Sequence, residues 1–179
     1  MYSWKNLQMV VTVVLLGLAA ACSLFEQNVE VLQTFELRID KPADAAMQFS
    51  VQKDVYTNTE QVQKYANDID AFVIRKISYK VKDFAGSEAP FVSGTIEFAP
   101  SGSNEFTMLS AITSLHLKEM AEQEQESTIV LPDKTVEEKL TELLRMGSPV
   151  TFRLNAVTDN NPIAATLVVY IDALMTVEM

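Results

Sequence analysis

The chain has 179 residues and carries 24 acidic against 14 basic side chains, which gives a formal net charge of −10 at pH 7. Nucleic-acid binding depends on Lys and Arg that neutralise phosphates, so an acidic chain of this kind predicts no nucleic-acid partner. Its length and its hydrophobic content of 48% suit one domain with a core that needs no disulfide. Cys22 is the only cysteine, which excludes an intramolecular disulfide.

The first residues have the pattern of a bacterial secretion signal. Lys5 and the amino terminus form a short positive region, and residues 9–21 contain no charged side chain. Such a segment is too short to cross the ~30 Å of bilayer hydrocarbon, which takes about 20 residues, but it suits the apolar part of a signal peptide. We therefore predict that residues 1–21 are a signal peptide that is removed.

The signal ends in Ala19, Ala20, Ala21 and Cys22, a sequence that resembles the lipobox of bacterial lipoproteins. The resemblance implies that Cys22 receives a diacylglycerol thioether, that the signal is cut before it, and that the new amino group is commonly acylated. The family usually has leucine three residues before the cysteine, where this chain has Ala19 and places Leu18 one residue earlier. Ala19 and Ala21 also form an A-x-A pattern, so cleavage by the lipoprotein peptidase or by the ordinary signal peptidase stays open.

Lipidation gives the lone cysteine a purpose, since a free thiol at the tip of a secreted domain would be a reactive liability. Each buried CH₂ contributes about 0.8 kcal/mol, and two or more acyl chains hold a protein stably in a membrane. Loss of residues 1–21 removes only Lys5 among charged residues, so the mature chain has a formal charge of −11 and little attraction for anionic lipids. We expect a membrane partner reached only through lipid on Cys22.

The residue after the cysteine indicates which of the two bacterial membranes holds the protein. Lipoproteins of Gram-negative bacteria usually carry Asp there for retention in the inner membrane, and Ser23 stands in that place. The resemblance therefore implies a lipid-anchored protein of the bacterial cell envelope in the outer membrane. Whether the domain lies on the periplasmic face or on the cell surface stays open.

Residues 22–28 are predicted to form the lipidated cysteine and a short tether, and residues 29–179 a single domain. Alternating apolar residues, with a slip of phase after Val31, predict a strand over residues 29–39 that ends before Pro42. A short strand is predicted over residues 47–51. A helix capped by Asn58 or Thr59 is expected to run to Ile69.

The middle of the chain returns to strand patterns. One face of a long strand is expected to carry Val73, Arg75, Ile77, Tyr79 and Val81, and the other face to carry Lys76, Ser78, Lys80 and Lys82. We expect this strand to pair as a hairpin with residues 91–98. A turn at 100–104, two short strands around Ser110, a helical turn or loop at 119–126 and a strand at 128–131 follow.

The clearest helix is predicted over residues 135–144, with Thr135 and Glu138 as a capping box and Gly147 as a left-handed cap. Strands are expected over residues 150–156 and 163–177, and the last one, apolar on both faces, is expected at the centre of a sheet. About eight strands and two short helices predict a mainly β fold, an antiparallel β-sandwich. In this it is similar to small envelope β-sandwich lipoproteins of unknown function.

No constellation of residues predicts catalysis or metal binding. His116 has no cysteine to activate, and no serine lies in a G-x-S-x-G motif, so a structural or solvated histidine is expected. Asp68 and Asp70, if helical, point about 200° apart and cannot share a site. The glutamates of residues 119–126 and the Asp159-Asn160-Asn161 turn lack the D-x-D-x-D-G loop of a calcium site. We expect no enzyme, cofactor or metal.

The one concentration of basic side chains gives weak candidates for binding an anion or a glycan, namely Arg75, Lys76, Tyr79, Lys80 and Lys82. The same lysines could instead prevent unwanted pairing at a strand edge, or they could lie opposite the glutamates of residues 119–126.

Two functions are open at this point. The first is a non-catalytic envelope lipoprotein whose domain binds an envelope protein partner or has a structural role. The alternative is a carrier of a lipid or another hydrophobic ligand. One reason for this alternative is that the last predicted strand is apolar on both faces. The other is a set of methionines, a residue type that suits adaptable apolar pockets: Met108, Met120, Met146 and Met175.

Overall fold

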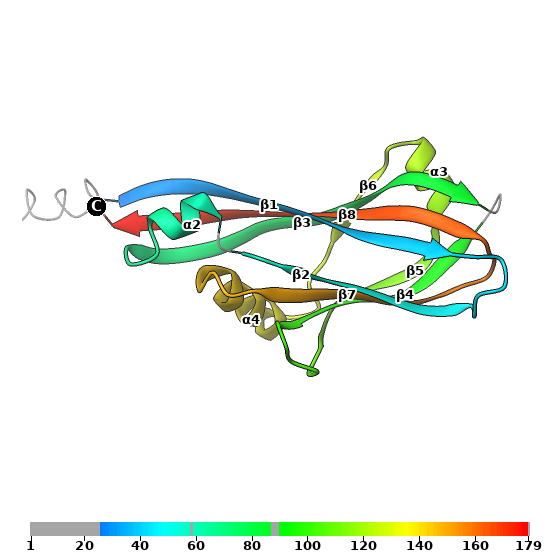
Figure 1. Cartoon of the computed structure of the whole chain (residues 1–179). Helices are drawn as coiled ribbons and strands as arrows, with labels where there is room; N and C mark the ends of the chain where they lie inside the picture. Colours follow the sequence, from blue (N-terminus) through cyan, green and yellow to red (C-terminus); the bar gives the residue numbers. More distant parts are fainter. Residues whose placement is uncertain (1–25, 58, 87–89, 179) are drawn as a thin grey trace, which may run out of the picture.

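The computed structural model describes residues 26–57, 59–86 and 90–178, and this part of the chain forms two antiparallel sheets of four strands that pack face to face (Figure 1). Sheet A contains, in spatial order, β1 (Glu26–Lys41), β8 (Ile163–Glu178), β3 (Ile69–Gly86) and β6 (Glu126–Ile129). Sheet B contains β2 (Gln48–Val55), β7 (Val150–Thr158), β4 (Phe91–Pro100) and β5 (Thr107–His116). The predicted antiparallel β-sandwich is confirmed.

The strand pairing follows one rule, in which β1 pairs with β8, β2 with β7, β3 with β6 and β4 with β5. The chain therefore folds like one long hairpin with the β4–β5 pair at its tip. Its arms roll up so that β8 also meets β3 and β7 also meets β4. This is the arrangement of a jelly roll, in which eight antiparallel strands form two sheets that pack face to face. It confirms the expected central position of β8.

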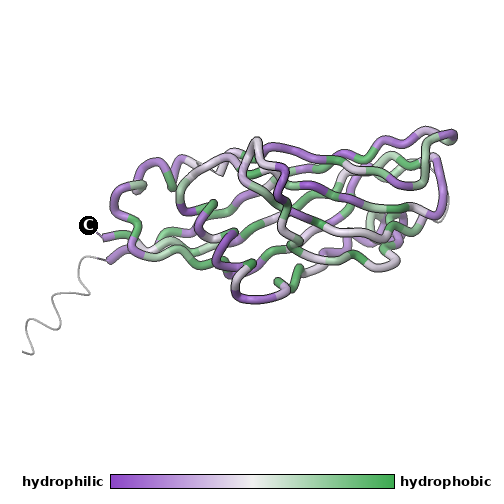
Figure 2. The backbone as a smooth tube through the Cα atoms, turned by 90° about the horizontal axis from the view of Figure 1, so that it is seen from below, coloured by the Kyte–Doolittle hydropathy of each residue, from purple (hydrophilic) through white to green (hydrophobic). Residues whose placement is uncertain are grey.

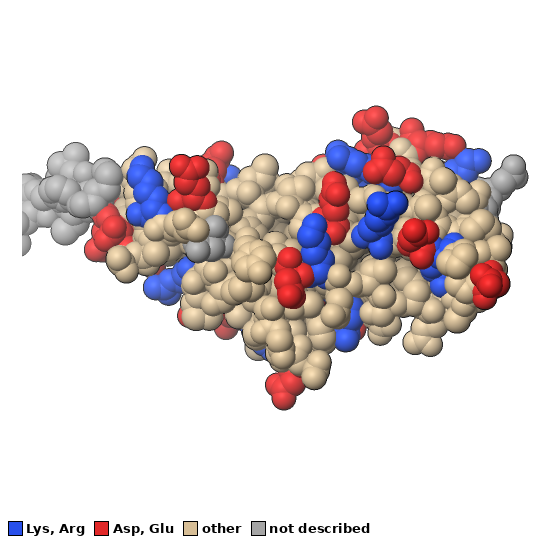
Figure 3. All heavy atoms as spheres, viewed as in Figure 1, with Lys and Arg blue, Asp and Glu red and all other residues tan. Residues whose placement is uncertain are grey.

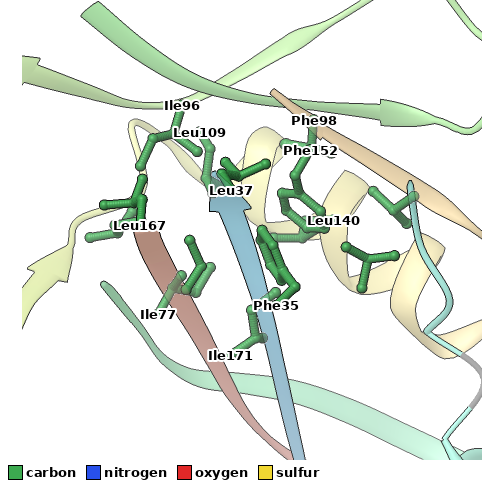
Figure 4. Packing of buried hydrophobic residues seen from close by; sticks show 14 of the residues in the cluster. Phe35, Leu37, Ile77, Ile96, Phe98, Leu109, Leu140, Phe152, Leu167 and Ile171 are labelled. Carbon is green, nitrogen blue, oxygen red and sulfur yellow. The ribbon is translucent and has the colours of Figure 1, made fainter. Parts of the chain in front are cut away.

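Apolar side chains from the two inner faces fill the space between the sheets (Figure 4). Figure 2 shows hydrophobic and hydrophilic residues alternating along the strands, as expected when one face is buried. The ring of Phe35 from sheet A stacks on Phe152 from sheet B, with centroids 4.3 Å apart. Phe98, the cross-strand neighbour of Phe152 within sheet B, has its ring centroid 6.5 Å from that of Phe152. The Phe35–Phe152 contact joins the two sheets.

The first strand is longer and more regular than predicted. It begins at Glu26, so the predicted tether is wrong for residues 26–28, which belong to β1. The predicted slip of phase is also wrong, because the register with β8 is continuous from Glu26 to Lys41. Gln33 is buried and takes an inward position between Val31 and Phe35. In the sequence, a polar residue at an inward position gives the same pattern as a change of phase, which explains the wrong prediction.

A bulge in β3 reverses the faces of that strand. The register with β8 shifts between Ile74 and Lys76, so Arg75 is an extra residue. Ile74 and Ile77 are buried, whereas Val73 and Arg75 are exposed. The prediction that Val73 and Arg75 share a face with Ile77 is therefore wrong.

Two predicted strand arrangements also differ from the structure. β3 and β4 lie in different sheets, so the predicted hairpin between them is wrong. Residues 107–116 form one strand rather than two around Ser110. The register of β5 shifts between the pairs Ile96–Ser110 and Glu97–Met108, and this bulge interrupts the alternation.

The described residues contain three helices, of which α2 (Glu60–Lys64) is the shortest. The predicted helix to Ile69 is wrong, because α2 ends at Lys64 and Ile69 begins β3. Thr59 caps α2 by accepting a hydrogen bond from the Val62 N–H at 3.3 Å. Asn58, the other predicted cap, lies outside the described residues.

The polar region after β5 contains α3 (Leu117–Glu122), and α4 (Lys134–Arg145) follows β6. The predicted capping box is wrong, since the cap of α4 is Asp133, whose Oδ1 accepts the Val136 N–H at 2.9 Å. Gly147 after the helix is left-handed, with φ of 63°, as predicted. Within the described part of the chain, none of the helices has the length and apolar character needed to span a bilayer.

Candidate functional site

Four of the five predicted ligand-binding residues, all basic, reach the outer face of sheet A, where acidic side chains meet them. Arg75 donates to Asp172 at 2.8 Å and to Glu30 at 3.0 Å. The hydrogen bond to Asp172, followed by that to Glu30, raises the pKa of the Arg75 guanidinium. Because β1 and β8 supply the two carboxylates, Arg75 ties together three neighbouring strands rather than facing an open anion site.

Lys76 and Lys80 are likewise engaged. The Lys76 ammonium lies 2.6 Å from Glu126 of β6. Hydrogen bonds from Lys76 and Ser78 lower the pKa of the Glu126 carboxyl. Lys80 lies over the Tyr170 ring, 5.3 Å from its centroid, and hydrogen bonding to Tyr170 raises the pKa of the lysine. Figure 3 shows acidic and basic side chains interspersed over the visible face of the molecule.

Tyr79 and Lys82 complete the predicted set. Tyr79 packs partly buried against the core, on the face opposite the lysines, and this burial raises the pKa of its hydroxyl. Lys80 and Lys82 share a shallow groove of about 270 Å³ with Asp83 and Glu124. Two lysines beside two carboxylates leave this groove without net positive charge. The arrangement therefore gives an anion little electrostatic advantage.

His116 has a structural role, as expected for it. It ends β5 and caps α3, where its Nδ1 accepts the Glu119 N–H at 3.1 Å. Its ring meets Phe91 edge to face, with centroids 4.8 Å apart. A nitrogen that accepts a backbone hydrogen bond is committed to the helix cap.

The predicted carboxylate positions do not gather. Asp68 lies in the turn after α2 and Asp70 in β3, so no helix carries both. Asp159 accepts the Phe91 N–H at 2.8 Å, and Asn161 donates to the Ala45 carbonyl at 2.8 Å, so both side chains bond to the backbone of distant segments. Among the residues that the structure describes, no three His, Cys, Asp or Glu side chains come together in a way that could hold a metal ion.

A polar network that was not predicted lies on the outer face of sheet B. Glu97 of β4 lies opposite Arg153 of β7, and their side chains are 2.5 Å apart. The Arg153 guanidinium stacks 3.5 Å from the Phe106 ring centroid, and Thr95 donates to Glu97 at 2.8 Å. Opposite charges on two predicted strands were a signal, but it identifies a pair only once the strand order is known. Every charged group here has a partner, so the network stabilises the sheet.

The features that suggested a carrier do not converge on one cavity. Met120 and Met175 are buried in the core, whereas Met108 and Met146 are exposed. An enclosed void between α2, α4 and sheet A, lined by Val62 among others, has no room for a water molecule. Along β8 the inward residues are buried, whereas those of the other face, apart from Val168, are at least partly exposed, so only one face of the strand lies in the core.

Cys22 and the predicted signal peptide lie outside the described residues, so the lipid anchor stays a prediction. No family model matches the chain, and no curated protein matches it. It is similar to the decameric BFDV capsid protein, with 5% identity and a TM-score of 0.40 over 84% of this chain and 98% of that one.

Two further likenesses are weaker. The turnip yellow mosaic virus structure has 9% identity and a TM-score of 0.27 over 86% of this chain and 95% of that one. A structure of carbohydrate-binding modules from the β-sandwich superfamily has 10% identity and a TM-score of 0.32, over 86% of this chain and 57% of that one. At such scores these likenesses carry no argument about what the chain does.

Proposed function

We propose that the chain is a lipoprotein of the bacterial cell envelope, anchored through lipid on Cys22, whose jelly-roll domain is a non-catalytic binding or structural module. The observation that carries the proposal is the lone cysteine placed directly after an uncharged apolar segment and three alanines. No second cysteine offers it a disulfide partner. The acidic surface makes a covalent lipid the better means of holding the domain at a membrane.

The position of the first strand is compatible with a close anchor. β1 starts at Glu26, four residues after Cys22, and the end of β8 pairs beside it. A lipid on Cys22 would hold this end of the sandwich near the bilayer. The turns between β1 and β2 and between β7 and β8 lie at the opposite end (Figure 1), where they would be farthest from the lipid.

The non-catalytic role is supported by how the polar side chains are used. Arg75, Lys76 and Arg153 are ion-paired, and His116 caps a helix. General acid–base chemistry needs a side chain that can reach a substrate proton, and these groups are already committed to structural bonds.

Ser23 supports the outer membrane as the place of the anchored protein.

The test is the mass of the N-terminal peptide from the full-length chain produced in a Gram-negative bacterium. We expect a triacylated peptide that begins at Cys22, and a membrane-bound protein. Cys22→Ser should release the protein to the soluble fraction, whereas the neighbouring Ser23→Ala should leave it in the membrane. An unmodified Cys22 thiol, or a chain that begins elsewhere, would refute the proposal.

A further inference from the structure

A groove of about 470 Å³ lies on the outer face of sheet B, at the end where β7 turns into β8 (Figure 1). Three strands meet at this groove, because β4 pairs with β5 on one side and with β7 on the other. The volume falls in the range of about 300–1,000 Å³ that small-molecule sites occupy. We call it the sheet B groove, and its lining residues are Phe91, Ser93, Ser114, Val157, Thr158 and Asp159.

The apolar part of the groove is a braced aromatic ring beside a valine. Phe91 is 40% exposed and Val157 is 50% exposed. The ring of His116 meets the Phe91 ring edge to face, with centroids 4.8 Å apart. Asp159 fixes the backbone of Phe91, since its Oδ1 accepts the Phe91 N–H at 2.8 Å and its own N–H donates to the Phe91 carbonyl at 3.1 Å. A ring that is already held in place costs little ordering when a ligand packs against it.

Hydroxyl and carboxylate groups lie next to this ring. Ser93 Oγ accepts the Ser114 N–H at 2.9 Å, which leaves its proton and a lone pair for a ligand. Ser114 lies at a bulge of β5 and has a left-handed φ of 49°, an uncommon conformation for a residue other than glycine. Within the described residues, no hydrogen bond engages its hydroxyl. Asp159 uses Oδ1 for the Phe91 N–H, so its second oxygen can accept a hydrogen bond from a ligand.

These groups distinguish between classes of ligand. Asp159 is the only charged residue of the lining, so an anionic ligand meets repulsion and no cation. A hydrocarbon would pack on Phe91 but would strip water from the serine hydroxyls and the carboxylate without replacing those hydrogen bonds. A sugar ring offers both kinds of contact, because its C–H face packs on the negative face of an aromatic ring and its hydroxyls donate and accept hydrogen bonds. An uncharged saccharide therefore fits the groove best.

We propose that the sheet B groove binds a neutral saccharide, which packs on Phe91 and forms hydrogen bonds with Ser93, Ser114 and Asp159. The inference rests on the proposed binding role of the domain, to which it adds a class of ligand, and it needs no lipid on Cys22. The groove lies at the end of the sandwich opposite the start of β1 (Figure 1). In a chain anchored at Cys22 it would therefore open away from the membrane, where a glycan can reach it.

The test applies the purified full-length chain, in a detergent without a sugar headgroup, to an array of neutral oligosaccharides and their sialylated versions. At least one neutral glycan should bind, and its sialylated version should bind no more tightly. Titration of that glycan should shift the amide NMR signals of Phe91, Ser93 and Val157. Phe91→Ala should weaken binding about two- to tenfold, the size of one aromatic contact, whereas Phe91→Tyr should bind as the parent does.

Tyr56→Ala is the matched control, because it removes an aromatic ring that is 76% exposed and lies outside the groove, and it should leave the affinity unchanged. The proposal is overturned if no neutral glycan binds, if the shifted amides lie elsewhere, if Phe91→Ala binds as tightly as the parent, or if the sialylated glycan binds more tightly. Circular dichroism shows whether each variant is folded. Cys22→Ser should bind the glycan as the parent does, so a failed lipid anchor and a failed groove give different results.

Discussion

Removing the Phe152 side chain should cost a large part of the stability of the domain. Phe152 is fully buried between the sheets, where it stacks on Phe35 and contacts Phe98. Phe→Ala in a core typically costs about 3–5 kcal/mol, of which the aromatic pair itself accounts for about 0.5–1.5 kcal/mol. The total free energy of unfolding of a domain is about 5–15 kcal/mol, so we expect Phe152→Ala to fold with a small margin.

Urea unfolding followed by far-UV circular dichroism measures this loss. At an m value of about 2 kcal/mol/M, a loss of about 4 kcal/mol moves the midpoint by about 2 M. A double-mutant cycle with Phe35→Ala should give a coupling of about 1 kcal/mol. Phe91→Ala, at a ring that is 40% exposed, is the control and should cost about 1 kcal/mol or less. A loss for Phe152→Ala as small as that of the control would refute the packing of the two sheets through this pair.

Four further predictions test the register, a helix cap, an ion pair and the membrane address. Gly94→Ala would place a Cβ 2.2 Å from a β7 carbonyl oxygen, so urea unfolding should show a loss of about 2 kcal/mol or more; no loss would contradict the β4–β7 register. Asp133→Ala should cost about 1 kcal/mol in the same assay, and Asp133→Ser should restore most of it. The Glu126 carboxyl should titrate below its ordinary pKa of 4.5 by carbon NMR, so its stabilising pair is complete above that pH and is lost as pH falls, and Lys76→Met should move the midpoint upward. Ser23→Asp should shift the protein from the outer to the inner membrane on density gradients, and an unchanged distribution would count against the lipoprotein address.

Strand positions were predictable where one face of a strand is buried. Alternation located β1, β4 and β7, because one face of each strand is buried along its length and the other meets solvent. β8 was located instead by its long apolar sequence. It failed at Arg75, where a bulge adds one residue and reverses the faces without any local mark in the sequence. It also misled at Gln33, because a buried polar residue looks like a change of phase.

Strand partners and ion pairs were not predictable for a different reason. In a rolled hairpin the partner of a strand lies far along the chain, so the nearest strand in sequence, taken as the partner of β3, lies in the other sheet. The basic group was correctly found as a cluster of charge. Its carboxylates come from strands 45 to 97 residues away, namely Glu30, Glu126 and Asp172. The spacing of basic residues along one strand does not reveal which carboxylates of other strands neutralise them.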